Sequence, residues 1–177
     1  MGRISRLEVE NFKSFGGRQV IAFREFSCVI GPNGCGKSNL IDAICFAMGL
    51  HAKQLRGEQM KDLVWHTLGK DGEITSAAKS ATVKVVYVVD DGEMDGVDGD
   101  QEVVFSRTIS STGATQYKID GKEYSWDAYS KVLEEINIVT KARNFLVFQG
   151  DVEGLASKTS RDLLAHFEAF CGSGDLK

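Results

Sequence analysis

Residues 31–39, Gly-Pro-Asn-Gly-Cys-Gly-Lys-Ser-Asn, decide the fold. They contain the spacing Gly-x4-Gly-Lys-Ser, formed by Gly31, Gly36, Lys37 and Ser38. Glycines at this spacing let backbone N–H groups turn toward a phosphate, because a Cβ would clash and restrict φ. The lysine can reach the β- and γ-phosphates of a nucleotide, and the serine hydroxyl can bind Mg²⁺. The stretch therefore predicts a nucleotide phosphate site that takes ATP and Mg²⁺.

The residues on either side of this loop have the patterns that such a site requires. Phe26–Ile30 is a short apolar run, which predicts a strand buried on both faces. Residues 38–48 carry apolar side chains at three- and four-residue steps and predict a helix that ends at Gly49. Because strand, loop and helix follow in this order, we favour a nucleotide site over a chance glycine loop.

The remaining segments predict an α/β protein. Leu7 and Val9 alternate with Glu8 and Glu10, the pattern of a half-buried strand. We expect further strands at 19–23, 82–89, 103–109, 116–120 and 145–148, a helix from Ser125 or Asp127 to about Ile136, and a last helix over 159–170. No internal repeat or long linker interrupts these elements, so a single domain over 1–177 is expected.

Composition excludes several classes of function. The net charge of −4 argues against a nucleic-acid binder held by bulk charge, so any DNA contact needs a local basic patch. No 18-residue apolar run is present, so no membrane partner is expected. The four cysteines lack zinc-site spacing. The acidic, glycine-rich stretch 90–100 predicts a solvated loop; a calcium loop is the alternative, but its spacing does not match an EF-hand.

Four further segments share a family pattern with the phosphate-binding loop. They are Asn11-Phe12-Lys13-Ser14-Phe15, Gln54-Leu55-Arg56-Gly57, Lys61-Asp62-Leu63-Val64 and Phe148-Gln149-Gly150-Asp151. Together they resemble ABC-type ATPases of the SMC and Rad-fifty group, over essentially the whole chain. The resemblance implies a P-loop ABC-type ATPase head, N-terminal half, with an antiparallel β subdomain plus a P-loop α/β core. The ending Ser-Gly-Asp-Leu at 173–176 is most similar to the cohesin branch of this family.

The resemblance also implies roles for individual residues. Gln149 would be the catalytic residue that reaches magnesium and the attacking water, and Ser38 with Gln149 would bind the metal. Arg56 would contact either the nucleotide or a DNA backbone, since a guanidinium suits both phosphates. Trp65 and His66 would flank the adenine, or Trp65 is a core residue. The residues expected to bind the nucleotide are Lys13, Ser14, Gly31, Pro32, Asn33, Gly34, Cys35, Gly36, Lys37, Ser38, Asn39 and Arg56.

Two motifs of such heads do not occur in the sequence: a Leu-Ser-Gly-Gly signature and an apolar strand ending in Asp-Glu. In the family both lie in a distant C-terminal segment, so we expect an N-terminal half-head that ends where a coiled coil begins. The implied partners are the C-terminal half of the same head, a second SMC head, a kleisin subunit and DNA, on nuclear chromosomes.

The half-head alone is expected to be inactive as an ATPase. The alternative to an ATPase is a nucleotide-gated structural or DNA-binding module with little turnover. A P-loop kinase or a small GTPase fits poorly, because two strands precede the loop and no guanine-reading Asn-Lys-x-Asp occurs.

Overall fold

A computed structural model describes residues 2–94, 96, 100–140, 145–147, 154 and 157–170 of the chain. Its contacts divide the chain into two compact units, Met1–Ile136 and Asn137–Lys177. Within the described ranges, no helix is both long enough and apolar enough to cross a membrane.

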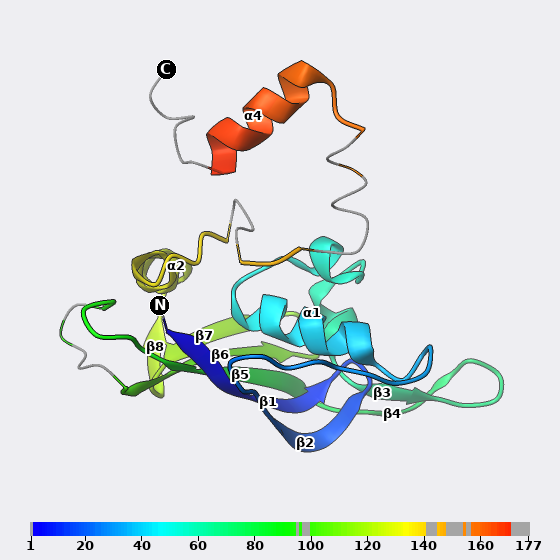
Figure 1. Cartoon of the computed structure of the whole chain (residues 1–177). Helices are drawn as coiled ribbons and strands as arrows, with labels where there is room; N and C mark the ends of the chain where they lie inside the picture. Colours follow the sequence, from blue (N-terminus) through cyan, green and yellow to red (C-terminus); the bar gives the residue numbers. More distant parts are fainter. Residues whose placement is uncertain are drawn as a thin grey trace. The chain divides into compact units, whose positions relative to one another are not determined.

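The first unit is built on a six-stranded sheet with the strand order β2-β1-β5-β6-β7-β8 (Figure 1). Every neighbouring pair in it is antiparallel. The strands are β1 (Arg3–Phe12), β2 (Phe15–Ala22), β5 (Ser80–Val88), β6 (Glu102–Ser110), β7 (Thr115–Ile119) and β8 (Lys122–Tyr124). The predicted antiparallel β subdomain is therefore present.

Alternation along the strands decides which face of the sheet is buried. Leu7 and Val9 of β1 are fully buried, and their register partners in β5 are Val85 and Val83, also fully buried. The residues between them, such as Glu8, point to the opposite face, because successive side chains of a strand alternate. The period-2 pattern of the sequence therefore predicted β1 correctly.

The helix α1 (Lys37–Ala47) packs on the apolar face of this sheet, against β1, β5 and β6 (Figure 1). Its buried residues include Ala43 and Phe46, and the Phe46 ring lies 5.1 Å from that of Phe12 at the end of β1. Gly49 ends the helix region with φ 93°, and a Cβ there would lie 2.2 Å from Trp126. Only a glycine allows that ring to close over the end of α1.

The helix α2 (Trp126–Glu135) follows the sheet. The sequence offered Ser125 or Asp127 as its cap; the structure selects Ser125, whose Oγ accepts a hydrogen bond from Ala128 N at 3.3 Å. Its buried residues Tyr129 and Leu133 lie four apart, as the pattern predicted. In the second unit, α4 (Ser160–Phe170) confirms the predicted last helix.

Between α1 and β5 lie elements that the sequence did not predict. They are the two 3-10 helices η1 (Ala52–Leu55) and η2 (Met60–Leu63), and a hairpin of β3 (His66–Leu68) and β4 (Ile74–Ala77) that projects from the body (Figure 1). Their strands are three and four residues long, which is too short for a clear periodic signal.

Two predicted strands are wrong. Phe26–Ile30 forms no strand and is exposed, with 89% of Phe26 and 86% of Ile30 accessible. A strand buried on both faces needs neighbours to pair with, and none of the described strands pairs with this segment. The other is 145–148: residues 145–147 form no strand and Val147 is 70% exposed, while Phe148 lies outside the described residues.

Candidate nucleotide-binding site

The N-terminus of α1 is open to an anion. Gly36 is the N-cap residue, with φ 97°, and as a glycine it supplies no side-chain cap. The first turn contains no acidic residue. The first N–H groups of a helix have no partner within it and carry a partial positive charge. With no side-chain cap from Gly36 and no acidic residue in the first turn, these N–H groups fit a phosphate group.

The loop before the helix is exposed over residues 31–35. Lys37 folds back over it, since its Nζ donates to Gly31 O and to Pro32 O, each at 2.7 Å. The structure thus gathers Gly31, Pro32, Asn33, Gly34, Cys35, Gly36, Lys37 and Ser38 around the start of α1, with the ammonium over the loop. The two carbonyls hold the Lys37 ammonium over the loop, where a phosphate would enter.

The turn between β1 and β2 lies beside this loop. Ser14 Oγ accepts a hydrogen bond from Asn39 Nδ2 at 2.8 Å, and it lies 3.1 Å from where a Cβ on Gly36 would be. Glycine at position 36 therefore serves two needs: the left-handed φ and the close approach of Ser14. Ser14, Gly36 and Asn39 are brought together, as the family resemblance implied for the N-terminal segment.

Lys13 and Arg56 both reach the side of α1 next to this turn. Lys13 Nζ donates to Asp42 Oδ2 at 2.5 Å and to Leu55 O. Arg56 Nη2 donates to Asp42 Oδ2 and, at 3.3 Å, to Asn39 Oδ1. Sequence reasoning did not single out Asp42; an aspartate within an apolar helix face, beside two basic segments of the family pattern, was the available signal.

The opposite end of α1 is held by two side chains that the sequence analysis did not single out. Arg107 of β6 is 2% exposed, and its Nη1 donates to Phe46 O at 3.0 Å and to Leu50 O at 2.7 Å. Its guanidinium lies 4.5 Å from the centre of the Phe46 ring. Tyr129 Oη donates to Ala47 O at 2.8 Å. A cation at a helix C-terminus is favourable, although burial lowers the pKa of Arg107.

Trp65 and His66 lie at the start of the β3–β4 hairpin. The Trp65 ring packs against Gly16, and a Cβ on Gly16 would lie 2.7 Å from that ring. His66 Nδ1 lies 3.0 Å from Val64 O.

Glu93, in the acidic loop, accepts hydrogen bonds from Tyr87 Oη and from Gly2 N, each at 2.8 Å. Among the residues that the structure describes, no group of three or more His, Cys, Asp or Glu could hold a metal ion.

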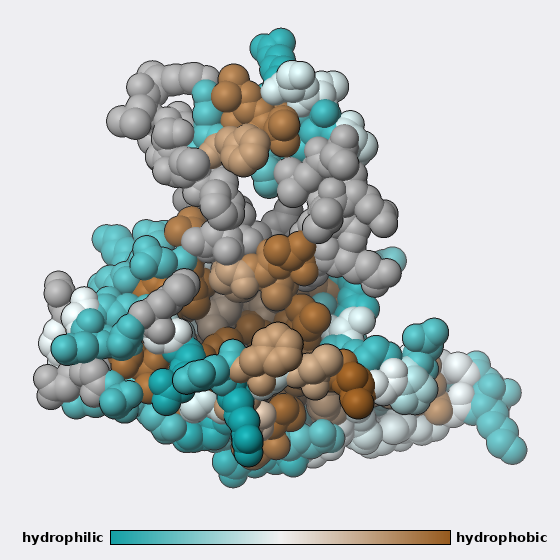
Figure 2. Space-filling model, in the orientation of Figure 1, coloured by the Kyte–Doolittle hydropathy of each residue, from teal (hydrophilic) through white to brown (hydrophobic). Residues whose placement is uncertain are grey.

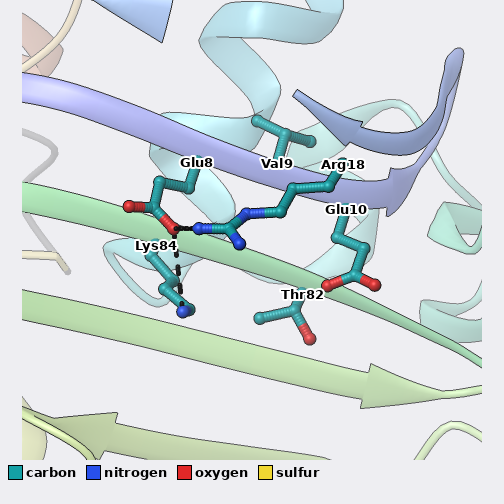
Figure 3. Close-up of a pocket in the computed structure, with 6 residues that line it drawn as sticks. All are labelled: Glu8, Val9, Glu10, Arg18, Thr82 and Lys84. Atoms are coloured by element: carbon teal, nitrogen blue, oxygen red, sulfur yellow. Dashed lines mark hydrogen bonds and ion pairs between the residues drawn. The ribbon is translucent and has the colours of Figure 1, made fainter. Parts of the chain in front are cut away.

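A small polar cavity lies on the face of the sheet away from α1 (Figure 3). Its residues are Glu8, Val9, Glu10, Arg18, Thr82 and Lys84. Glu8 Oε2 lies 3.0 Å from Arg18 Nη2 and 3.7 Å from Lys84 Nζ. Burial alone would raise the pKa of Glu8, but the hydrogen bond from Arg18 and the charge of Lys84 outweigh it and lower the pKa.

Gln149, with its neighbours Phe148, Gly150 and Asp151, lies outside the described residues. Its predicted role in catalysis and in binding the metal therefore stays a prediction. Ser38, the other predicted metal ligand, is exposed at the second residue of α1. A hydroxyl at that position is a suitable oxygen ligand for Mg²⁺.

Comparison with known proteins identifies relatives along the whole chain. Residues 3–142 match the family model of the RecF/RecN/SMC N terminal domain. Structural maintenance of chromosomes protein 1 of Arabidopsis thaliana is 45% identical over 99% of this chain. The protein of that name from Schizosaccharomyces pombe is 43% identical over 100% of the chain. In both cases the chain spans 14% of the relative's length.

Solved structures similar to this chain include SMC heads. One, an SMC ATPase studied for its ATP-driven dimerization and DNA stimulated activation, superposes with a TM-score of 0.81. It is 29% identical and covers 94% of this chain and 98% of its own. An Smc head of Pyrococcus furiosus bound to the C-terminal domain of ScpA gives a TM-score of 0.77 at 32% identity, over 93% of this chain and 41% of its own.

Proposed function

The chain belongs to the SMC family of ATPase heads. We propose that it is the ATP-binding N-terminal half of a head that resembles that of the first SMC subunit of cohesin. The observation that carries the proposal is the uncapped N-terminus of α1, with Lys37 folded over the loop that precedes it. Its relatives named structural maintenance of chromosomes protein 1 support the choice of branch.

In this proposal each residue of the loop has a defined task. The backbone N–H groups from Gly34 to Ser38 surround the phosphates, and Lys37 neutralises charge on the β- and γ-phosphates. Ser38 and Gln149 would hold Mg²⁺, which would supply further charge neutralisation at the phosphates. Gln149 orients the water that attacks the γ-phosphate. Positioning and electrostatic stabilisation supply most of the rate in phosphoryl transfer, so hydrolysis of ATP needs all of these groups together.

We infer that the C-terminal half of the same head covers the segment before the loop. Phe26 and Ile30 are 89% and 86% exposed, and Val29 and Ile41 are 47% and 40% exposed. Figure 2 shows apolar side chains gathered over α1 and the segment that leads to it. A patch of this kind marks a surface that another element covers. The chain spans 14% of the length of these relatives, which therefore have room for such an element.

The proposed partners follow from the family. A second SMC head would close over the γ-phosphate, a kleisin subunit would bind the heads, and the complex would act on DNA in nuclear chromosomes. The relatives' names, structural maintenance of chromosomes, and the Smc head solved with ScpA support this set. We propose that residues 1–177 form the N-terminal lobe of such a head, ending at the start of a coiled coil.

Steady-state phosphate release tests the proposal on three samples: this chain alone, the chain joined to its C-terminal half, and that head mixed with a partner head. We expect turnover only in the third sample, because the general base and the closing loop come from outside the chain. Head dimerisation by ATP without measurable turnover would favour the nucleotide-gated module instead. Turnover by the chain alone that Lys37→Ala abolishes would mean that these 177 residues hold a complete active site.

A further inference from the structure

Asp42, in the second turn of α1, is the meeting point of two cations. Its Oδ2 accepts hydrogen bonds from Lys13 Nζ and from Arg56 Nη2. The side chain of Asp42 is 4% exposed and that of Lys13 is 12% exposed, whereas that of Arg56 is 55% exposed. One carboxylate therefore holds a covered ammonium and a guanidinium that still faces solvent.

The two cations are not equivalent. Lys13 Nζ is shared between Asp42 and Leu55 O, so it joins the β1–β2 turn to α1 and to the end of η1. Arg56 uses Nη2 for Asp42 and Asn39. A guanidinium has five N–H donors in a fixed plane, so donors of Arg56 remain for a ligand.

The guanidinium of Arg56 also points along α1 toward the phosphate loop. Asn39, its second partner, lies in the first turn of α1, and the Asn39 amide donates to Ser14 Oγ beside Gly36. Lys13 and Arg56 both have left-handed backbones, with φ 50° and φ 58°. Long side chains rarely adopt this conformation, and it persists where surrounding contacts fix it. Here the shared contact is Asp42.

We propose that Asp42 is the positioning residue that sets the Arg56 guanidinium beside the first turn of α1, where its remaining donors bind a phosphate oxygen of the nucleotide. This inference rests on the proposed function of the site. It assigns Arg56 to the nucleotide rather than to DNA, because the side chain lies along the phosphate helix. Lys13 acts indirectly, by holding the carboxylate in place.

The test measures Mg-ATP affinity by calorimetry, without DNA, in the complete head formed with the C-terminal half. Asp42→Asn keeps the shape of the side chain and removes its charge, so Arg56 loses its anchor. We expect about tenfold weaker ATP binding from Asp42→Asn and a similar loss from Arg56→Ala, the size of one charge-assisted contact. The double variant should bind no more weakly than Arg56→Ala, because Asp42 acts through Arg56.

Glu8→Gln is the matched control. Like Asp42→Asn, it removes a carboxylate that contacts two cations, here Arg18 and Lys84, but on the face of the sheet away from α1 (Figure 3). It should therefore leave ATP affinity unchanged. Asp42→Asn leaves Lys13 buried without its counter-charge, which can unfold the head. The same cycle is therefore repeated in a Lys13→Met background, where no buried ammonium remains alone.

Three results would overturn the inference. An equal loss from Asp42→Asn in the Arg56→Ala background would make Asp42 a structural link between segments. Unchanged ATP affinity with weakened DNA binding would assign Arg56 to DNA. Unchanged affinity for both would leave Asp42 with no positioning role. The proposed function fails separately, if the unmodified head does not bind ATP and Lys37→Ala makes no difference.

Discussion

Replacing Arg107 with methionine should destabilise the first unit, because this side chain holds the end of the phosphate helix. Arg107 Nη1 donates to Phe46 O and Leu50 O, and its guanidinium lies over the rings of Phe46 and Tyr117 at 4.5 and 5.0 Å. Methionine fills most of the same space but has no donor. Leu50 O would then lose this donor, whereas Phe46 O would keep the hydrogen bond from Gly49 N at 3.1 Å.

The expected size follows from these contacts. Leaving Leu50 O without this donor costs about 1–3 kcal/mol, and losing one of the two hydrogen bonds to Phe46 O costs about 0.5–1.5 kcal/mol. The lost contacts with the two rings add about 0.5–2 kcal/mol in total. Against this, the variant no longer buries a guanidinium, and replacing a buried charge by an apolar side chain recovers about 1–4 kcal/mol. We expect a net loss of about 1–3 kcal/mol in the free energy of unfolding.

Urea denaturation of the head, followed by circular dichroism, measures this loss. Arg6→Met is the matched control, since Arg6 pairs with Glu102 at 2.7 Å on the surface, where the side chains are 36% and 45% exposed. Exposed pairs of this kind contribute about 0–1 kcal/mol. An Arg107→Met variant as stable as Arg6→Met would refute the reasoning, because the carbonyls of α1 would then not depend on Arg107.

Three further predictions concern the site and the sheet. Gln149→Ala should leave ATP affinity largely intact and depress turnover by the paired heads; a normal kcat would show that its role is wrong. Gly36→Ala should weaken ATP binding about tenfold. The backbone of Gly36 has φ 97°, which strains any residue with a Cβ, and the new Cβ would lie 3.1 Å from Ser14 Oγ. Wild-type affinity measured by calorimetry would contradict this prediction. The pKa of Glu8 is lowered, so its contribution to stability is complete above the unfolded value of 4.5 and disappears as the pH falls through the folded value. The stability difference between wild type and Glu8→Gln should therefore shrink on acidification, and a difference that grows instead would exclude the ion pairs of Glu8 as its source.

The sequence predicted well the parts of the fold whose signal is local. Leu7 and Val9 alternate with charged residues, and the strand they predict is β1. The phosphate loop is specified by its own glycines, and the helix after it by its own periodicity. The start of α2 was predicted to within two residues, at Ser125 or Asp127, and its cap is Ser125. Each of these depends on interactions within a few residues of the chain.

The parts that could not be predicted depend on distant contacts. Phe26–Ile30 has the composition of a buried strand, but composition does not say which element buries it. Arg107 looks like a solvated residue of β6, yet it reaches carbonyls 57 and 61 residues away. Asp42 likewise accepts a hydrogen bond from Lys13, which lies 29 residues earlier in the chain. Short-range patterns carry no information on such pairs.

The most direct test of the account is the ATP affinity of the complete head with and without Lys37→Ala. The variant removes the ammonium that lies over the phosphate loop, where it now contacts Gly31 O and Pro32 O. Losing a charge-assisted contact costs about 1.5–3 kcal/mol or more, so affinity should fall at least about tenfold. Lys70→Ala, in the exposed turn of the β3–β4 hairpin, should bind ATP as wild type does. Affinity of Lys37→Ala within about twofold of wild type would contradict the assignment of this loop to the nucleotide phosphates.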